Sequence, residues 1–143
     1  MLIDISNLIT PEVYEIIYRM GHMDELVIAD ANYSASAVSS RVVYLYASEN
    51  HVLLAEILKY FPLDDFAAFP VTVMKPDYGF ADEPEIWSYY DHVFSTVYKA
   101  KKPDLTQIPR EAFYERTKRA YATIQTTDPR VYADIILRKG FVT

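Results

Sequence analysis

Residues 20–35, MGHMDELVIADANYSA, place a histidine before a short apolar run and a carboxylate directly after it. The run, residues 26–29, is continuously apolar, which is typical of a strand buried on both faces of a sheet. Asp30 follows at its carboxyl end, where ligands of open α/β sheets collect. His22 lies just beyond a helical segment that Gly21 is expected to end. Both polar residues are therefore candidates for a functional site.

Helical and extended patterns alternate along the rest of the chain. Residues 8–21 predict a helix with Thr10 as its N-terminal cap. Other helices are predicted over residues 49–62, 82–102 and 110–120, and strands over 41–47, 69–75, 121–126 and 132–140, the last two joined by a turn at Asp128-Pro129. The alternation predicts an α/β fold, in which a central sheet is covered by helices. A length of 143 residues fits one domain over residues 1–143.

Charge and composition exclude several classes of partner. A formal net charge of -6 disfavours nucleic acid, because phosphate binding needs a basic face. No apolar stretch approaches the roughly 18 residues needed to span a bilayer, and the N-terminus has no basic leader, so no membrane partner is expected. The chain has no cysteine, which fits a reducing compartment. We expect a cytoplasmic protein.

The sequence contains no pattern typical of a metal or cofactor site. His22, His51 and His92 are far apart, so none forms a closely spaced zinc motif. Only three glycines are present, which makes phosphate-binding or dinucleotide-binding loops implausible. We expect neither a metal ion nor a cofactor.

Three more polar side chains lie at the ends of predicted elements. Arg110 begins the helix after Pro109, and Tyr132 and Asp134 flank Ala133 at the start of the last strand. Taken singly, each has an ordinary structural explanation as a surface cation, a core aromatic or a turn former. Spacing alone therefore does not establish a catalytic role for this set.

Three blocks of sequence together resemble the L-fucose mutarotase and D-ribose pyranase family: residues 20–35, PREAFYERTKRAYATIQT at 109–126, and YADIILRKG at 132–140. The likeness extends over nearly the whole chain and is least specific over residues 44–105. It implies a mixed sheet flanked by helices, and a closed homo-oligomeric ring for which a decamer is one candidate size. It also implies an isomerase without a cofactor, which interconverts the anomers or ring forms of a free monosaccharide in pockets near subunit contacts.

The resemblance also assigns roles to individual residues. The family's catalytic histidine falls on His22. Its substrate-binding positions fall on Asp30, Arg110, Tyr132, Ala133 and Asp134. We expect Tyr132 to serve in catalysis as a second acid. Two questions stay open at this point: whether Asp30 orients His22 or binds a sugar hydroxyl, and whether a neighbouring chain completes the pocket.

Two positions bear on the choice of sugar and activity. Arg110, followed by Phe-Tyr-Glu, resembles the L-fucose branch, whereas the ribose branch tends to carry histidine there. Asp134 departs from the asparagine that is usual in the family, and a carboxylate accepts hydrogen bonds where an amide can also donate. L-Fucose mutarotase activity is the expectation. The alternatives are a D-ribose pyranase, a non-catalytic monosaccharide-binding protein and a purely structural ring-forming protein.

Overall fold

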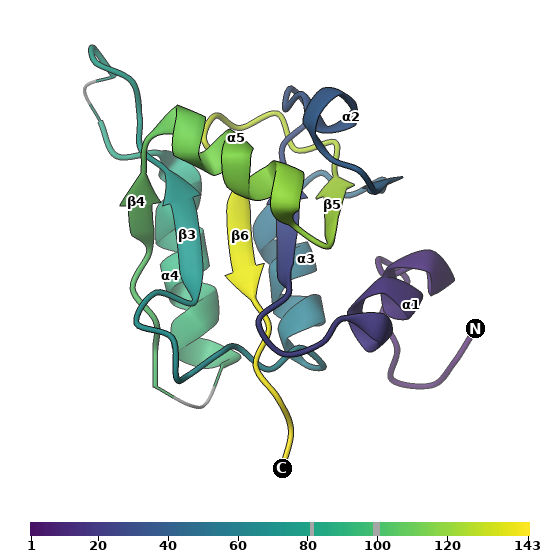
Figure 1. Cartoon of the computed structure of the whole chain (residues 1–143). Helices are drawn as coiled ribbons and strands as arrows, with labels where there is room; N and C mark the ends of the chain where they lie inside the picture. Colours follow the sequence, from purple (N-terminus) through teal and green to yellow (C-terminus); the bar gives the residue numbers. More distant parts are fainter. Residues whose placement is uncertain (81, 99–100) are drawn as a thin grey trace.

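The computed structural model describes residues 1–80, 82–98 and 101–143. Its centre is a mixed sheet with the strand order β2-β5-β1-β6-β3-β4 (Figure 1). The strands are β1 Glu25–Ala29, β2 Val42–Tyr44, β3 Val71–Met74, β4 Thr106–Ile108, β5 Ala122–Gln125 and β6 Ile135–Arg138. The helices are α1 Pro11–Arg19, α2 Ala35–Val38, α3 Asn50–Leu58, α4 Glu85–Thr96 and α5 Arg110–Arg119. The expected α/β fold with a mixed sheet is confirmed.

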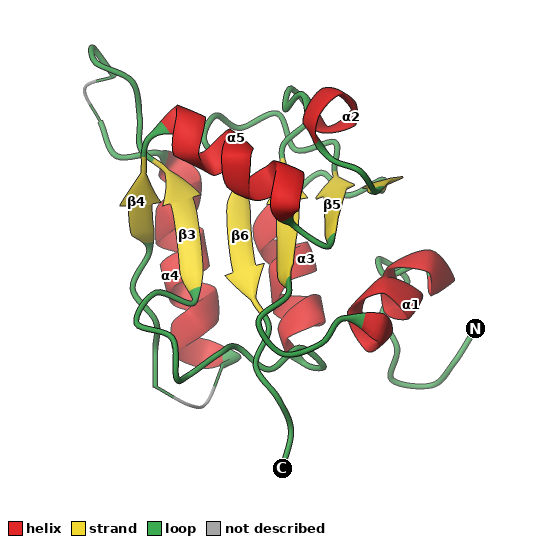
Figure 2. Cartoon of the chain, viewed as in Figure 1, coloured by secondary structure: helices red, strands yellow, loops and turns green. Residues whose placement is uncertain are grey.

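Strand direction gives the sheet two chemically different edges. β6 is antiparallel to its neighbours β1 and β3, while the other pairs are parallel. The carboxyl ends of β1, β3 and β4 therefore lie at one edge together with the amino end of β6, as the arrowheads in Figure 2 show. We call this the carboxyl edge of the sheet and the opposite one the amino edge.

Helices cover both faces of the sheet, with α5 and α2 in front and α3 and α4 behind (Figure 2). The buried residues form two clusters accordingly, one shared with α1, α3 and α4 and the other with α2 and α5. In β1, Leu26 and Ile28 belong to the first cluster, and Val27 and Ala29 to the second. Burial on both faces explains the continuous apolar run. No helix of the described residues is long and apolar enough to cross a membrane.

The first helix begins as predicted but does not end as predicted. The Thr10 side chain accepts a hydrogen bond from the Val13 amide, which confirms the cap. Gly21 does not form the C-terminal stop, because α1 ends at Arg19 and Met20 is already extended, with φ -61° and ψ 135°. The Lys139 ammonium instead binds the free carbonyls of Ile17 and Met20, both at 2.6 Å. Carbonyls at the end of the helix are therefore bonded by a residue from the far end of the chain.

Other differences concern short elements and connections. The predictions missed α2 and β4. The other predicted strands and helices extend up to a few residues beyond the observed ones, except β1, which is one residue longer than predicted. The helix predicted over 82–102 ends at Thr96, and residues 99–100 lie outside the described residues. The turn before β6 is at residues 131–132 rather than at Asp128-Pro129. β5 and β6 do not pair with each other, because β1 lies between them.

Candidate functional site

A cavity of about 400 Å³ opens at the carboxyl edge of the sheet. Its walls come from the ends of β1 and β3, the segment before β6, the start of α5 and the loop after β3. The lining residues are Asp30, Asn32, Tyr33, Met74, Phe80, Arg110, Tyr114, Val131, Tyr132 and Asp134. The volume is in the usual range for small-molecule sites, and polar groups converge on it from several elements. Four residues proposed from the sequence thus lie together: Asp30, Arg110, Tyr132 and Asp134.

Asp30 and Asp134 form the floor of this cavity. The Asp30 amide donates a hydrogen bond to Oδ1 of Asp134 at 2.8 Å, and the Asp30 carboxylate accepts one from the Asn32 amide at 2.8 Å. Only 7% of Asp30 and 4% of Asp134 is exposed. Burial raises the pKa of Asp30, although the amide of Asn32 opposes that shift. Burial, together with the charge of Asp30, raises the pKa of Asp134 well above its ordinary value.

The tripeptide before β6 is held from behind by α3 and α4. The Trp87 indole donates to the Tyr132 carbonyl at 3.0 Å, and the Tyr90 hydroxyl donates to the Ala133 carbonyl. The Asn50 side chain also donates to the Ala133 carbonyl, at 3.3 Å. Tyr132 has a φ of 57°, a left-handed conformation that costs energy for a residue with a side chain. These bonds stabilise that conformation, so the Tyr132 side chain faces the cavity.

Ala133 does not line the cavity. Its side chain is fully buried in the core, and its carbonyl is occupied by the two donors from α3 and α4. The expected substrate contact at this position could therefore come only from the main chain. The tripeptide acts mainly by fixing the positions of the residues on either side of Ala133.

Arg110 is linked to Tyr132 through Asp77, in the loop after β3. The guanidinium of Arg110 forms an ion pair with the Asp77 carboxylate. The Asp77 amide donates to the Tyr132 hydroxyl at 3.0 Å, and the Phe80 ring packs edge-on against the Tyr132 ring with centroids 5.0 Å apart. Because that hydroxyl accepts from an amide, its own hydrogen is free to point elsewhere. Asp77 thus positions both the cation and the phenol.

His22 lies at the opposite edge of the sheet. It precedes β1, whereas Asp30 follows it, so the length of the strand separates them by roughly 16 Å. Its Nε2 is 3.3 Å from Oδ1 of Asp64, and its ring meets Phe141 edge-on at 5.0 Å. Burial tends to raise the pKa of Asp64, but hydrogen bonds from Arg138 and His22 outweigh it and lower that pKa. Within one chain, the structure does not bring His22 to the other proposed site residues.

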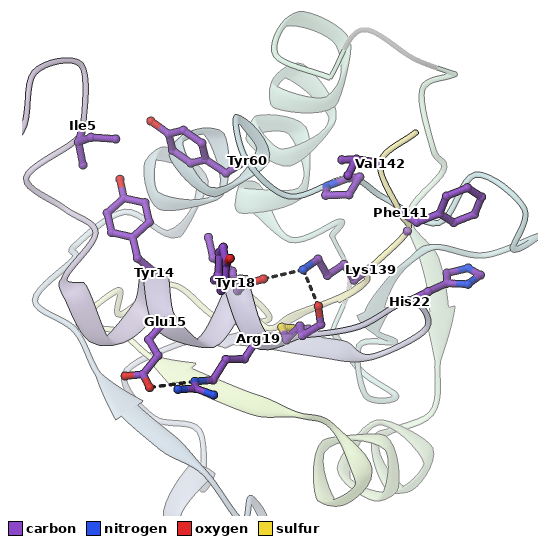
Figure 3. A pocket seen from close by; sticks show the side chains of 14 residues that line it. Ile5, Tyr14, Glu15, Tyr18, Arg19, His22, Tyr60, Lys139, Phe141 and Val142 are labelled. Carbon is purple, nitrogen blue, oxygen red and sulfur yellow. Dashed lines mark hydrogen bonds and ion pairs between the residues drawn. The ribbon is translucent and has the colours of Figure 1, made fainter.

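The surroundings of His22 form a second and larger cavity of about 1000 Å³ (Figure 3). Its walls are mainly apolar and come from α1, the end of α3 and the C-terminal segment. Figure 3 shows His22 and Phe141 side by side at its margin, with Lys139 turned toward helix α1. Several large side chains here are exposed, among them Tyr18 at 89% and Val142 at 84%. Compared with the cavity at the carboxyl edge, this one has a larger share of apolar wall.

Sequence reasoning missed several residues that line or support the first cavity. Asn32 and Tyr33 lie within residues 20–35, and Tyr114 lies in the Phe-Tyr-Glu segment, so the sequence carries a signal for these three residues. Tyr33 stacks on Tyr114 with centroids 4.9 Å apart, and its hydroxyl bonds Thr117 at 2.7 Å. Asp77 and Phe80 have no sequence signal, because a loop brings them to the site.

The site combines carboxyl oxygens, a guanidinium and a phenol, with aromatic rings around them. Such a set can accept from and donate to several hydroxyl groups at once, and the rings can cover an apolar face of a ligand. Among the described residues no group of three or more histidine, cysteine, aspartate or glutamate side chains could hold a metal ion. The site therefore has the chemistry of a pocket for a small polyhydroxylated molecule.

Fold and site together define an α/β protein with a polar, aromatic-lined pocket at the carboxyl edge of a mixed sheet. The family described as RbsD / FucU transport protein matches residues 3–142. The chain belongs to this RbsD/FucU family, and the family resemblance noted in the sequence is confirmed.

Solved structures show the same relationship. The chain is similar to the fucose mutarotase of Streptococcus pneumoniae in complex with L-fucose, with 35% identity, a TM-score of 0.92, and coverage of 99% of this chain and 100% of that one. It is similar to FucU from Bifidobacterium longum, with 33% identity, a TM-score of 0.90, and coverage of 97% and 99%. Bacillus subtilis RbsD, solved with D-ribose, shares the fold at 21% identity and a TM-score of 0.72, with coverage of 96% and 98%. The chain is thus more similar to these fucose-branch structures than to that RbsD.

Proposed function

We propose that this protein is a monosaccharide mutarotase that interconverts the α and β anomers of L-fucose or a similar hexose. The observation that carries the proposal is the convergence of Asp30, Arg110, Tyr132 and Asp134 on one cavity of about 400 Å³. The full-length similarity to a fucose mutarotase bound to L-fucose supports it. The reaction breaks and re-forms one carbon–oxygen bond of the hemiacetal, so acid–base groups suffice for it.

The residues of the cavity fit the parts of this reaction. Ring opening requires removal of the proton of the anomeric hydroxyl and protonation of the ring oxygen. The Tyr132 hydroxyl, which accepts from the Asp77 amide, keeps its hydrogen for a sugar oxygen. The guanidinium of Arg110 can donate to ring or hydroxyl oxygens through its rigid fork. We assign Asp30 the role of accepting from a sugar hydroxyl, because its carboxylate lines the cavity.

His22 enters this mechanism from a second copy of the chain. In one chain it lies at the other edge of the sheet, beside exposed apolar side chains such as Tyr18 and Val142. A contact between the amino edge of one copy and the carboxyl edge of the next would cover this surface and bring an imidazole to the cavity. An imidazole has an unperturbed pKa of about 6.5, which suits proton transfer near neutral pH. The proposal therefore includes a closed homo-oligomer, and the same chemistry suits a cytoplasmic enzyme of sugar metabolism.

Saturation-transfer NMR on free sugars tests the proposed function directly. Irradiating one anomeric proton of L-fucose should attenuate the other anomer's signal faster with the protein present than in buffer alone. Parallel measurements on D-ribose, D-galactose and L-rhamnose give the preferred sugar. Unaccelerated exchange for every sugar tried would contradict the enzymatic proposal.

The separation of His22 from the cavity in one chain favours a second candidate, a monosaccharide-binding protein without catalytic activity. In that case titration calorimetry would show binding of L-fucose while anomer exchange stayed at its uncatalysed rate. The two measurements on one protein sample separate the candidates.

Replacing Arg110 with histidine is expected to shift the preference from L-fucose toward D-ribose. The substitution removes a charged donor worth about 1.5–3 kcal/mol, so exchange of L-fucose should slow by roughly tenfold or more relative to D-ribose. Exchange rates on both sugars measure the ratio. Arg119→His, an exposed change at the other end of α5, is the matched control. An unaltered ratio in Arg110→His would argue against the fucose-branch assignment.

Replacing Asp77 with asparagine is expected to weaken sugar binding by a few-fold. The substitution keeps the amide that bonds Tyr132 but removes the ion pair that holds Arg110, and exposed pairs of this kind are worth about 0–1 kcal/mol. Calorimetric titration with L-fucose measures the change. Asp91→Asn breaks an exposed ion pair with Lys102 and provides the control. Tighter binding by Asp77→Asn would mean that Asp77 competes with the sugar for Arg110.

A further inference from the structure

Two buried aspartates, Asp30 and Asp134, are neighbours in the cavity wall, and neither forms an ion pair in the part of the chain that the structure describes. Asp30 and Asp134 are 7% and 4% exposed, and the Asp30 amide bonds Oδ1 of Asp134 at 2.8 Å. Arg110, which lines the same cavity, pairs instead with Asp77. Two neighbouring carboxyl groups that are shielded from water do not both ionise readily.

We propose that Asp134 carries a proton at neutral pH and donates it to the Asp30 carboxylate, so that the pair holds one negative charge. In that form Asp134 makes the same two hydrogen bonds as an asparagine: its carbonyl oxygen accepts from the Asp30 amide, and its hydroxyl donates to the Asp30 carboxylate. Asp30 also accepts from the Asn32 amide, which favours placing the negative charge on Asp30. Asp134 is then a positioning residue for Asp30, and it adds no second charge to the cavity.

The surrounding charges favour this single negative charge. The titratable and charged groups around the pair are Tyr33 after β1, Tyr90 on α4, Asp128 and Arg130 after β5, Arg110 and Tyr114 on α5, and Tyr132. Burial raises the pKa values of Tyr33 and Tyr90, so both are neutral at pH 7. The charge of Asp128 raises the pKa of Asp30 further. The two guanidinium groups near the pair are bound by other carboxylates, Arg110 by Asp77 and Arg130 by Asp128.

The proton assignment predicts how stability depends on pH. The pKa of Asp134 is raised on folding, so the folded chain holds a proton that the unfolded chain releases above its carboxyl pKa of about 3.9. The contribution of Asp134 to the free energy of unfolding is therefore fully present below that pH, and it is lost as the pH rises toward the folded pKa. Asp134→Asn removes this loss. Between the unfolded and the folded pKa of Asp134, we compare the unfolding constant of the wild type with that of Asp134→Asn. The ratio of the first to the second should rise about tenfold per pH unit.

Urea titrations of both proteins at a series of pH values measure this ratio. Asp128→Asn is the matched control with the opposite sign: burial tends to raise the pKa of Asp128, but hydrogen bonds from Arg130 lower it, so its contribution to stability is lost as the pH falls. A wild-type to Asp134→Asn ratio that does not change with pH would overturn the proposal. So would an Asp134→Asn protein that fails to fold, since an amide makes both bonds.

Carboxyl ¹³C NMR on aspartate-labelled protein gives a readout that needs neither unfolding nor sugar. One carboxyl resonance should titrate well above the ordinary range and should be missing from Asp134→Asn. If every aspartate resonance titrates in the ordinary acidic range, the proposal is wrong.

The consequence for sugar exchange rests on the proposed function. The wild-type exchange rate on L-fucose should fall at alkaline pH as the pair gains a second charge, and this fall should be absent from Asp134→Asn when each protein is normalised to its own rate near neutral pH. An equal fall in both proteins would contradict the positioning role. If neither protein accelerates exchange at any pH, the proposed function fails, while the urea and NMR titrations still decide the proton assignment.

Discussion

Replacing His22 with alanine is expected to slow the protein-accelerated exchange of L-fucose anomers by about 10²–10⁴-fold, the usual contribution of a positioned acid–base group. The fold should survive, because the His22 side chain is 41% exposed and Asp64 keeps its hydrogen bond from Arg138. Saturation-transfer NMR measures the exchange, and circular dichroism with thermal unfolding measures the fold. His92→Ala, an exposed change on α4, is the control. Exchange at the wild-type rate would remove His22 from the mechanism.

A mixture of two inactive variants tests whether His22 acts across subunits. His22→Ala lacks the imidazole, and Tyr132→Phe lacks the phenol of the cavity. If each site takes its cavity from one chain and its histidine from the next, an equal mixture assembled together should regain about a quarter of the sites. Chains that use their own histidine would regain none. A mixture as inactive as its components would therefore contradict the in-trans arrangement.

The sequence alone supports the fold where its local patterns are strong. The apolar run of β1 and the capped start of α1 are local features, and both appear as predicted. The three-residue strand β4 and the four-residue helix α2 are too short for periodicity to detect. The strand order depends on contacts between distant segments, so the position of β1 between β5 and β6 has no local signal. Lys139, which binds carbonyls at the end of α1, is a contact of the same long-range kind.

The same distinction between local sequence patterns and long-range contacts applies to the candidate site. Asp30, Tyr132 and Asp134 lie next to strands that pack side by side, but the sequence groups them only through the family resemblance, because the pairing of β1 with β6 has no local signal. Asp77 comes from an irregular loop, and its contacts with Arg110 and Tyr132 depend on a loop conformation that no pattern specifies. His22 shows the limit most clearly: a motif can assign it a role, but only an assembly of chains can place it at the cavity.

Gly140, at the end of the sequence block over residues 132–140, is expected to tolerate no side chain. A Cβ there would lie 2.4 Å from the Leu63 carbonyl oxygen and 2.8 Å from the Leu63 carbonyl carbon, both backbone atoms that cannot rotate away. The Gly140 amide also donates to the Pro62 carbonyl at 2.7 Å, so the two segments cannot separate without losing that bond. Gly140→Ala should destabilise the fold by about 1–3 kcal/mol, the usual cost of overpacking.

The same substitution should also reduce activity, because the displaced segment carries Asp64. Its Oδ1 lies 3.3 Å from Nε2 of His22, so a shift at Leu63 changes the position of the imidazole. Urea unfolding measures the stability loss, and L-fucose exchange on the folded fraction measures the activity. Gly21→Ala is the matched control: its added Cβ would meet only Oδ2 of Asp24, at 3.7 Å, so its stability should stay within about 0.5 kcal/mol of wild type. Equal urea midpoints for Gly140→Ala and wild type would show that the Leu63 segment moves freely, and Asp64 would then not hold His22 in a fixed position.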